Sequence, residues 1–186
     1  PLPDRPIAAM KARVWIRQGQ LSVVLAWARE QCLSPDDDLS YLREFEHLTL
    51  ARVHIARYRN DRDESAIRGG LRLLDRLYQA ADAAGRTGSV IEVLLLQALA
   101  HHAQGTTLSA ITALERALTL AEPEGYVRLF VEEGEEMRLL VLDFRLWIEK
   151  HKPESYQKII AYTDRLQAAF ALATVPQSAV STRSEQ

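Results

Sequence analysis

The chain has 186 residues, of which 47% are hydrophobic and 26% charged, proportions typical of a globular protein with a buried core. Its 23 basic and 25 acidic side chains give a formal net charge of −2, so the composition shows no basic surface for nucleic acid. The most apolar stretch, residues 90–100, is interrupted by Glu92 and Gln97 and is too short to span a bilayer.

Apolar residues recur every three or four positions along most of the chain, which is the period of an amphipathic helix. Glycine, proline and short polar runs divide this pattern into segments. The sequence therefore predicts an all-α fold of eight or nine helices, over residues 7–18, 21–31, 41–57, 64–84, 90–104, 108–122, 126–132, 137–150 and 154–172. Residues 1–173 would form the domain, and residues 174–186 a polar tail or linker.

Two of the predicted helices have unusual compositions. The helix at 90–104 is apolar almost all round, so we expect it to be enclosed by its neighbours. The helix at 64–84 contains Gly69 and Gly70, which together cost roughly 2 kcal/mol relative to alanine. These glycines require a close packing contact, or the helix kinks there. Ser40 and Ser89 are predicted to cap the helices that follow them.

The turns between helices recur at similar intervals. Gly19, Asp61 and Gly105 are 42 and 44 residues apart. Five residues after each turn stands a small or apolar residue, namely Val24, Ala66-Ile67 and Ala110-Ile111. Small residues at such positions allow two helices to cross closely, so the pattern indicates a TPR-like α-solenoid of helix-turn-helix pairs. An irregular helical bundle is the alternative.

Several segments carry a resemblance to a known family. Residues 117–134, with the sequence ALTLAEPEGYVRLFVEEG, resemble the end of the helical-repeat region in large ATP-dependent LuxR-type, MalT-like transcription activators. The same region is similar to residues 12–19, 27–29, 41–53, 85–89 and 91–100. The resemblance implies a full-length protein with an ATPase module, a winged-helix region, a repeat domain that receives the inducer, and a C-terminal helix-turn-helix.

The chain contains no phosphate-binding loop and no recognisable helix-turn-helix, so the family's ATP- and DNA-binding residues have no counterpart here. We expect no cofactor in this chain, with ATP implied only for the missing module and DNA bound only through the missing helix-turn-helix. The histidines lack metal-ligand spacing, and the single cysteine, Cys32, has no neighbouring base. That cysteine also excludes an internal disulfide and fits the cytoplasm. We therefore expect a protein that is not an enzyme.

The candidate binding residues come from the repeat pattern. In repeats of this type the first helix of each pair lines the concave surface. This places six residues at or near one face, namely Arg13, Arg52, Tyr58, Arg59, Glu92 and His102. Arginines beside an aromatic ring and a carboxylate suit a peptide or a small polar ligand. The alternative is a solvated face without a ligand.

Together these observations predict a sensor and interaction domain of a LuxR/MalT-like transcriptional regulator. It would bind a small-molecule inducer or a protein or peptide partner, and no membrane. The alternative is a general TPR scaffold for protein–protein interaction outside transcription.

Overall fold

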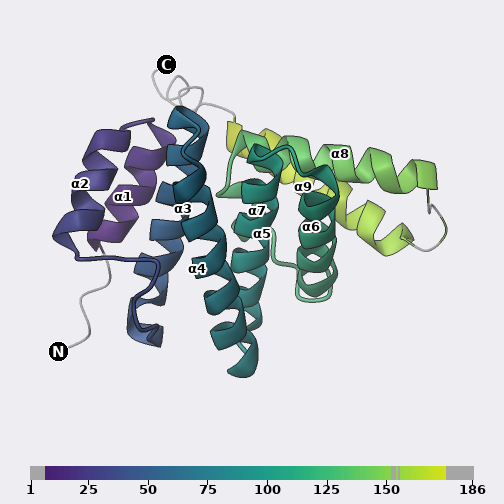
Figure 1. The fold of residues 1–186 in the computed structure, drawn as a ribbon. Coiled ribbons are helices and arrows are strands. Elements are labelled where there is room, and N and C mark those ends of the chain that lie inside the picture. Colours follow the sequence, from purple (N-terminus) through teal and green to yellow (C-terminus); the bar gives the residue numbers. More distant parts are fainter. Residues whose placement is uncertain (1–6, 152–153, 155, 175–186) are drawn as a thin grey trace, which may run out of the picture. The chain divides into compact units, whose positions relative to one another are not determined.

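The computed structural model describes residues 7–151, 154 and 156–174. These residues form nine α-helices and one short 3-10 helix, with no strand among them (Figure 1). In chain order they are α1 (Ile7–Arg17), α2 (Leu21–Glu30), η1 (Tyr41–Arg43), α3 (Glu44–Asp61), α4 (Glu64–Ala83), α5 (Thr87–Ala103), α6 (Thr107–Ala121), α7 (Arg128–Val131), α8 (Glu135–His151) and α9 (Gln157–Thr174). The predicted all-α fold is confirmed. The predicted tail lies outside the described residues, apart from Thr174 at the end of α9.

The chain divides into two compact units, residues 1–117 and 118–186. The first unit holds the helix pairs α1/α2 and α3/α4, followed by α5 and most of α6. Within it, α1 contacts α3 and α3 contacts α5, so the first helices of successive pairs pack against one another. Each of α2 and α4 contacts both its own first helix and the next one. The extent of the predicted domain, residues 1–173, stays a prediction.

The turns inside the pairs fix the repeat length. Gly19, Arg62 and Gly105 have φ values of 70°, 54° and 74°, and they stand 43 residues apart. The middle turn therefore lies one residue later than predicted. The residues five positions after these turns, Val24, Ile67 and Ala110, are all 0% exposed. The predicted repeat is thus present, with a regular 43-residue spacing.

Gly69 and Gly70 lie inside α4, which runs without a break from residue 64 to residue 83. A Cβ atom on Gly70 would lie 2.9 Å from the Cβ of His54 in α3. The absence of a side chain at Gly70 lets the two helices approach closely. The packing reason expected for these glycines is confirmed.

Helix α5 is enclosed as predicted. From Val90 to Ala100 every residue is buried except Glu92 and Gln97, which are half-buried. Helices α3 and α4 both contact it. The two half-buried polar residues hydrogen-bond to other helices, Glu92 to Arg52 in α3 and Gln97 to Asp75 in α4.

The two predicted serine caps are wrong. Ser40 precedes η1, but its side chain makes no capping hydrogen bond. Helix α5 begins at Thr87, so Ser89 lies inside it, and the Ser89 hydroxyl donates to the Glu44 carboxylate of α3. Glu44 is only 9% exposed, and a buried carboxylate requires donors. Arg86 also contacts it, at 2.7 Å.

The second unit has its own core. Phe130 of α7 and Tyr162 of α9 meet edge to face, with ring centroids 5.9 Å apart. The Tyr162 hydroxyl donates to the backbone carbonyl of Tyr126, and burial raises the pKa of Tyr162. Met137 and Phe144 of α8 are 0% exposed in the same unit. None of the helices in the described residues is long and apolar enough to cross a membrane.

Candidate functional site

Three of the six predicted site residues come together on successive first helices of the first unit. Arg13 of α1 and Arg52 of α3 both contact Oε1 of Glu92 in α5, at 3.0 Å and 2.9 Å. The neighbouring first helices pack side by side, so residues about 40 positions apart in the sequence become adjacent. We call Arg13, Arg52 and Glu92 the arginine–glutamate cluster.

Further contacts hold the two guanidinium groups in place. Nε of Arg13 donates to the Thr49 hydroxyl at 3.1 Å, and its guanidinium carbon lies 3.7 Å from the centroid of the Phe45 ring. Arg52 donates to the backbone carbonyl of Leu48 at 3.2 Å. The sequence analysis did not select Phe45 and Thr49. Their spacing from Arg52 on α3, seven and three residues, is the signal that places all three on one helix face.

The two arginines of the cluster keep the half-buried Glu92 carboxylate ionised. Burial acts to raise the pKa of Glu92, but the positive charges of Arg52 and Arg13 outweigh it, so this pKa is lowered. The carboxylate is therefore ionised at neutral pH, and two guanidinium groups share it. The side chains of Arg13, Arg52 and Glu92 are 18%, 11% and 14% exposed. The cluster thus lies just below the surface.

The other three predicted residues are not members of the cluster. Arg59 stands two helical turns after Arg52 and is half-buried. Tyr58 is 6% exposed and belongs to the core, with the guanidinium of Arg62 5.5 Å from its ring centroid. His102 is exposed near the end of α5, ten residues from Glu92, which is roughly 15 Å along a helix. The structure therefore joins three of the six residues, and a fourth, Arg59, lies on the same face of α3 as Arg52.

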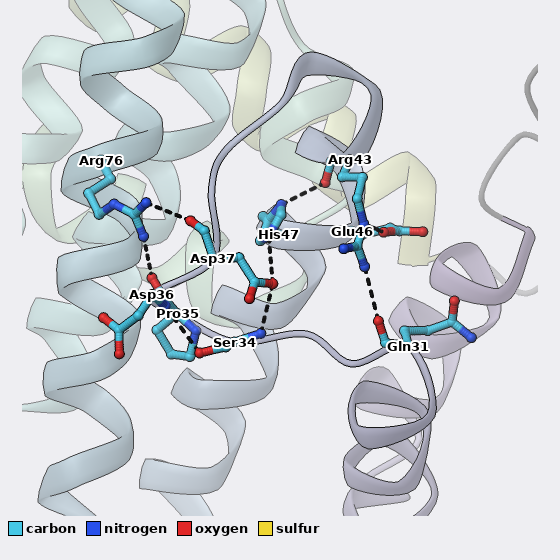
Figure 2. Close-up of polar contacts among 9 residues, drawn as sticks. All are labelled: Gln31, Ser34, Pro35, Asp36, Asp37, Arg43, Glu46, His47 and Arg76. Atoms are coloured by element: carbon cyan, nitrogen blue, oxygen red, sulfur yellow. Dashed lines mark hydrogen bonds and ion pairs between the residues drawn. The ribbon is translucent and has the colours of Figure 1, made fainter.

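A second polar region lies in the connector between α2 and α3, residues 31–40 (Figure 2). Arg76 of α4 donates to the backbone carbonyls of Pro35 and Asp37, both at 2.6 Å. The backbone N–H of Ser34 donates to the Asp37 carboxylate and is the main cause of its lowered pKa. His47 of α3, 0% exposed, lies 3.2 Å from the same carboxylate. The connector is thus fastened to both helices of the second pair, which the sequence analysis did not anticipate.

The remaining candidate groups are the side chains that could bind a metal ion and the single cysteine, Cys32. Among the described residues, no group of three or more histidine, cysteine, aspartate or glutamate side chains could hold a metal ion. Cys32 is exposed and follows α2, with a φ of 49°.

The fold and the cluster together define a class of protein, an all-α repeat domain of TPR-like helix pairs whose first helices share a polar face. A family model described as the MalT-like TPR region matches residues 3–144, and the chain belongs to this family. The resemblance found in the sequence is therefore confirmed. Comparisons with curated proteins and with solved structures gave no significant match.

Proposed function

We propose that this chain is the sensor region of a LuxR-type, MalT-like transcriptional regulator. It binds an inducer or a protein partner on the face formed by α1, α3 and α5. It acts by binding rather than catalysis, holds no cofactor, and works in the cytoplasm. In the full-length regulator, ATP and DNA bind to other modules.

The arginine–glutamate cluster is the observation that carries this proposal. Its three members come from three consecutive first helices, so a ligand that contacts them touches all three pairs of the first unit at once. Such a ligand would change the spacing between the pairs if it bound one spacing more tightly than another. A regulator switches only when its effector has unequal affinity for two states. A cluster shared among repeats provides a physical basis for that difference.

A reporter assay with the full-length regulator tests the proposal. Arg52 is 11% exposed and paired, so Arg52→Lys, which keeps the charge but loses the planar two-pronged donor, is preferable to alanine. We expect Arg52→Lys and Arg59→Ala each to raise the half-maximal inducer concentration by about tenfold, equivalent to about 1.4 kcal/mol. Arg68→Ala, at an exposed position of α4, is the control and should leave the dose-response unchanged. An unaltered response in both test variants, at normal protein levels, would contradict the proposal.

A further inference from the structure

One face of helix α1 is both apolar and exposed. Ile7, Met10 and Val14 stand three and four residues apart, so they form a single stripe along the helix. Their side chains are 61%, 54% and 40% exposed. We call these three residues the α1 stripe. A contiguous apolar surface of this kind is typical of a site that another structural element covers.

The 43-residue repeat identifies the positions in the other first helices that correspond to the α1 stripe. The counterparts of its first two residues are Leu50 and Val53 in α3, and Val93 and Leu96 in α5. All four are at most 4% exposed. The counterparts of Val14 are the half-buried Arg57 and the buried Ala100. These positions are therefore covered in both first helices that have a helix pair before them.

The contacts of α5 show which helices cover these positions. Glu92 bonds to α3, and Gln97 bonds to α4. At 3.6 residues per turn, Val93 and Leu96 lie on the arc of α5 between Glu92 and Gln97. This arc therefore faces both helices of the preceding pair, and α5 contacts both of them.

Helix α1 has the same apolar arc without the same cover. The α1/α2 pair lies at one end of the first unit (Figure 1). Helix α1 contacts α2 and α3, and the α1 stripe stays exposed in the described part of the chain. A helix that closes the end of a repeat stack normally has a polar outer face, which keeps the protein soluble. The outer face of α1 is instead that of an internal repeat.

Lys11 indicates the charge of the covering helix. It is exposed beside the α1 stripe, and its counterpart in α5 is Gln97, which donates to the Asp75 carboxylate of α4 at 2.8 Å. In α3 the counterpart is His54, and Cys32, just after α2, stands where α4 has Asp75. A lysine at this position suits a preceding second helix that has a carboxylate in the place of Asp75, as α4 does.

We propose that a further helix pair of the same kind packs on the α1 stripe, as α3 and α4 pack on α5, with a carboxylate of its second helix paired with Lys11. The stack of helix pairs then continues past α1 in the full-length protein. The surface involves none of the residues of the arginine–glutamate cluster. The proposal relies on the full-length regulator of the proposed function, but inducer binding does not enter into its test.

The test compares the reactivity of a thiol at position 10 in two proteins. Met10→Cys is introduced into the 186-residue chain and into the full-length regulator, both are treated with N-ethylmaleimide, and mass spectrometry follows the peptide that contains position 10. A covered thiol reacts only when the structure opens locally, so we expect labelling in the full-length protein to be slower by about tenfold or more.

Arg29→Cys is the matched control. Arg29 is exposed on α2, and its counterpart Arg72 is 65% exposed on α4, although α4 contacts the first helices on either side of it. A thiol at position 29 should therefore react at the same rate in both proteins. Hydrogen exchange of the α1 amides in the two wild-type proteins requires no substitution, and it should also be slower in the full-length protein.

Cross-linking identifies the helix that covers the stripe. A carbodiimide joins Lys11 to a carboxylate in direct contact with it, and we expect the partner peptide to come from a segment with a helical period outside residues 1–186. The proposal is overturned if position 10 reacts equally fast in both proteins, or if it is already protected in the 186-residue chain. It is also overturned if Lys11 forms no cross-link, or forms one to residues of this chain, from the same or a second copy, or to a segment without a helical period.

Discussion

At the scale of single residues, Gly70 sets how closely α3 and α4 approach. The Cβ position of Gly70 lies 2.9 Å from Cβ of His54, closer than two carbon atoms that are not bonded normally approach. A Cβ atom on its neighbour Gly69 would have its nearest contact at 3.6 Å, which is an ordinary van der Waals distance. Two adjacent glycines in one helix therefore have different roles, and only one of them is needed for packing.

This difference predicts opposite effects of the same substitution. Gly70→Ala should lower the free energy of unfolding by about 1–3 kcal/mol, because the added methyl group forces the helices apart. Gly69→Ala should leave stability unchanged or raise it by up to about 1 kcal/mol, because alanine favours the helix and restricts the unfolded chain. Urea unfolding followed by circular dichroism measures both. Equal losses in the two variants would show that the close approach at Gly70 is not the cause.

At the scale of elements, the sequence predicts those features of a helix, such as its limits and its burial, that depend on the local pattern of apolar and polar residues. The limits of α2 and α8 fall within two residues of prediction because glycine and polar runs stop the apolar period there. The burial of α5 follows in the same way from its uniformly apolar surface. The pairing of Arg13 with Glu92 is different, since it depends on which first helices become neighbours. The repeat phase brought these residues towards one face, but it did not exclude Tyr58, which points into the core.

The connector between α2 and α3 shows why some features are beyond local pattern. Residues 34–38, Ser-Pro-Asp-Asp-Asp, have the composition of an ordinary solvated loop. Their fixed conformation comes from Arg76, about 40 residues later, and from the buried ring of His47. Nothing in the loop itself indicates those partners. The sequence around Ser89 likewise does not indicate its partner. The Ser89 hydroxyl donates to Glu44 of α3 instead of capping its own helix, α5.

The attachment of this connector can be measured. Arg76→Ala removes two hydrogen bonds from a charged donor to backbone carbonyls, so we expect a loss of roughly 1.5–3 kcal/mol and faster cleavage before Asp36–Asp38 by an aspartate-specific protease. Arg72→Ala is the matched control on the same helix. Its contact with Asp36 is 3.5 Å long and both side chains are largely exposed, so the loss should stay below about 0.5 kcal/mol. Equal cleavage rates in the two variants would contradict the fastening role of Arg76.

At the scale of the whole molecule, the stability of the first unit should depend on pH through two partly buried histidines. Burial lowers the pKa of His54, the nearby Arg57 lowers it further, and Asp63 opposes them. Burial also lowers the pKa of His101, against the effect of Asp75. A histidine with a lowered pKa in the folded state binds its proton more readily when the chain unfolds. Its contribution to stability is present above the unfolded pKa of about 6.5 and is lost as the pH falls through that value.

The carboxylates affect the stability of the first unit in a separate pH range. The lowered pKa values of Asp37 and Glu92 mean that their contribution is lost only as the pH falls below about 4, near the pKa of an unfolded carboxyl group. A change in stability between pH 7 and pH 5 therefore arises from histidine. Each linked proton adds at most about 1.4 kcal/mol per pH unit to the slope.

We therefore predict that the unfolding free energy of the first unit falls as the pH is lowered from 7 to 5, and that His54→Gln makes this slope smaller. The measurement is urea unfolding followed by tryptophan fluorescence in a Trp147→Phe background, since the remaining tryptophans, Trp15 and Trp27, both lie in the first unit. His102→Gln, at an exposed position of α5, is the control and should leave the slope unchanged. The slope is the quantity to compare, because His54→Gln also alters packing against Gly70 and shifts stability at every pH. A slope that is identical in the wild type and in His54→Gln would show that the proton bound on unfolding is not taken up by His54.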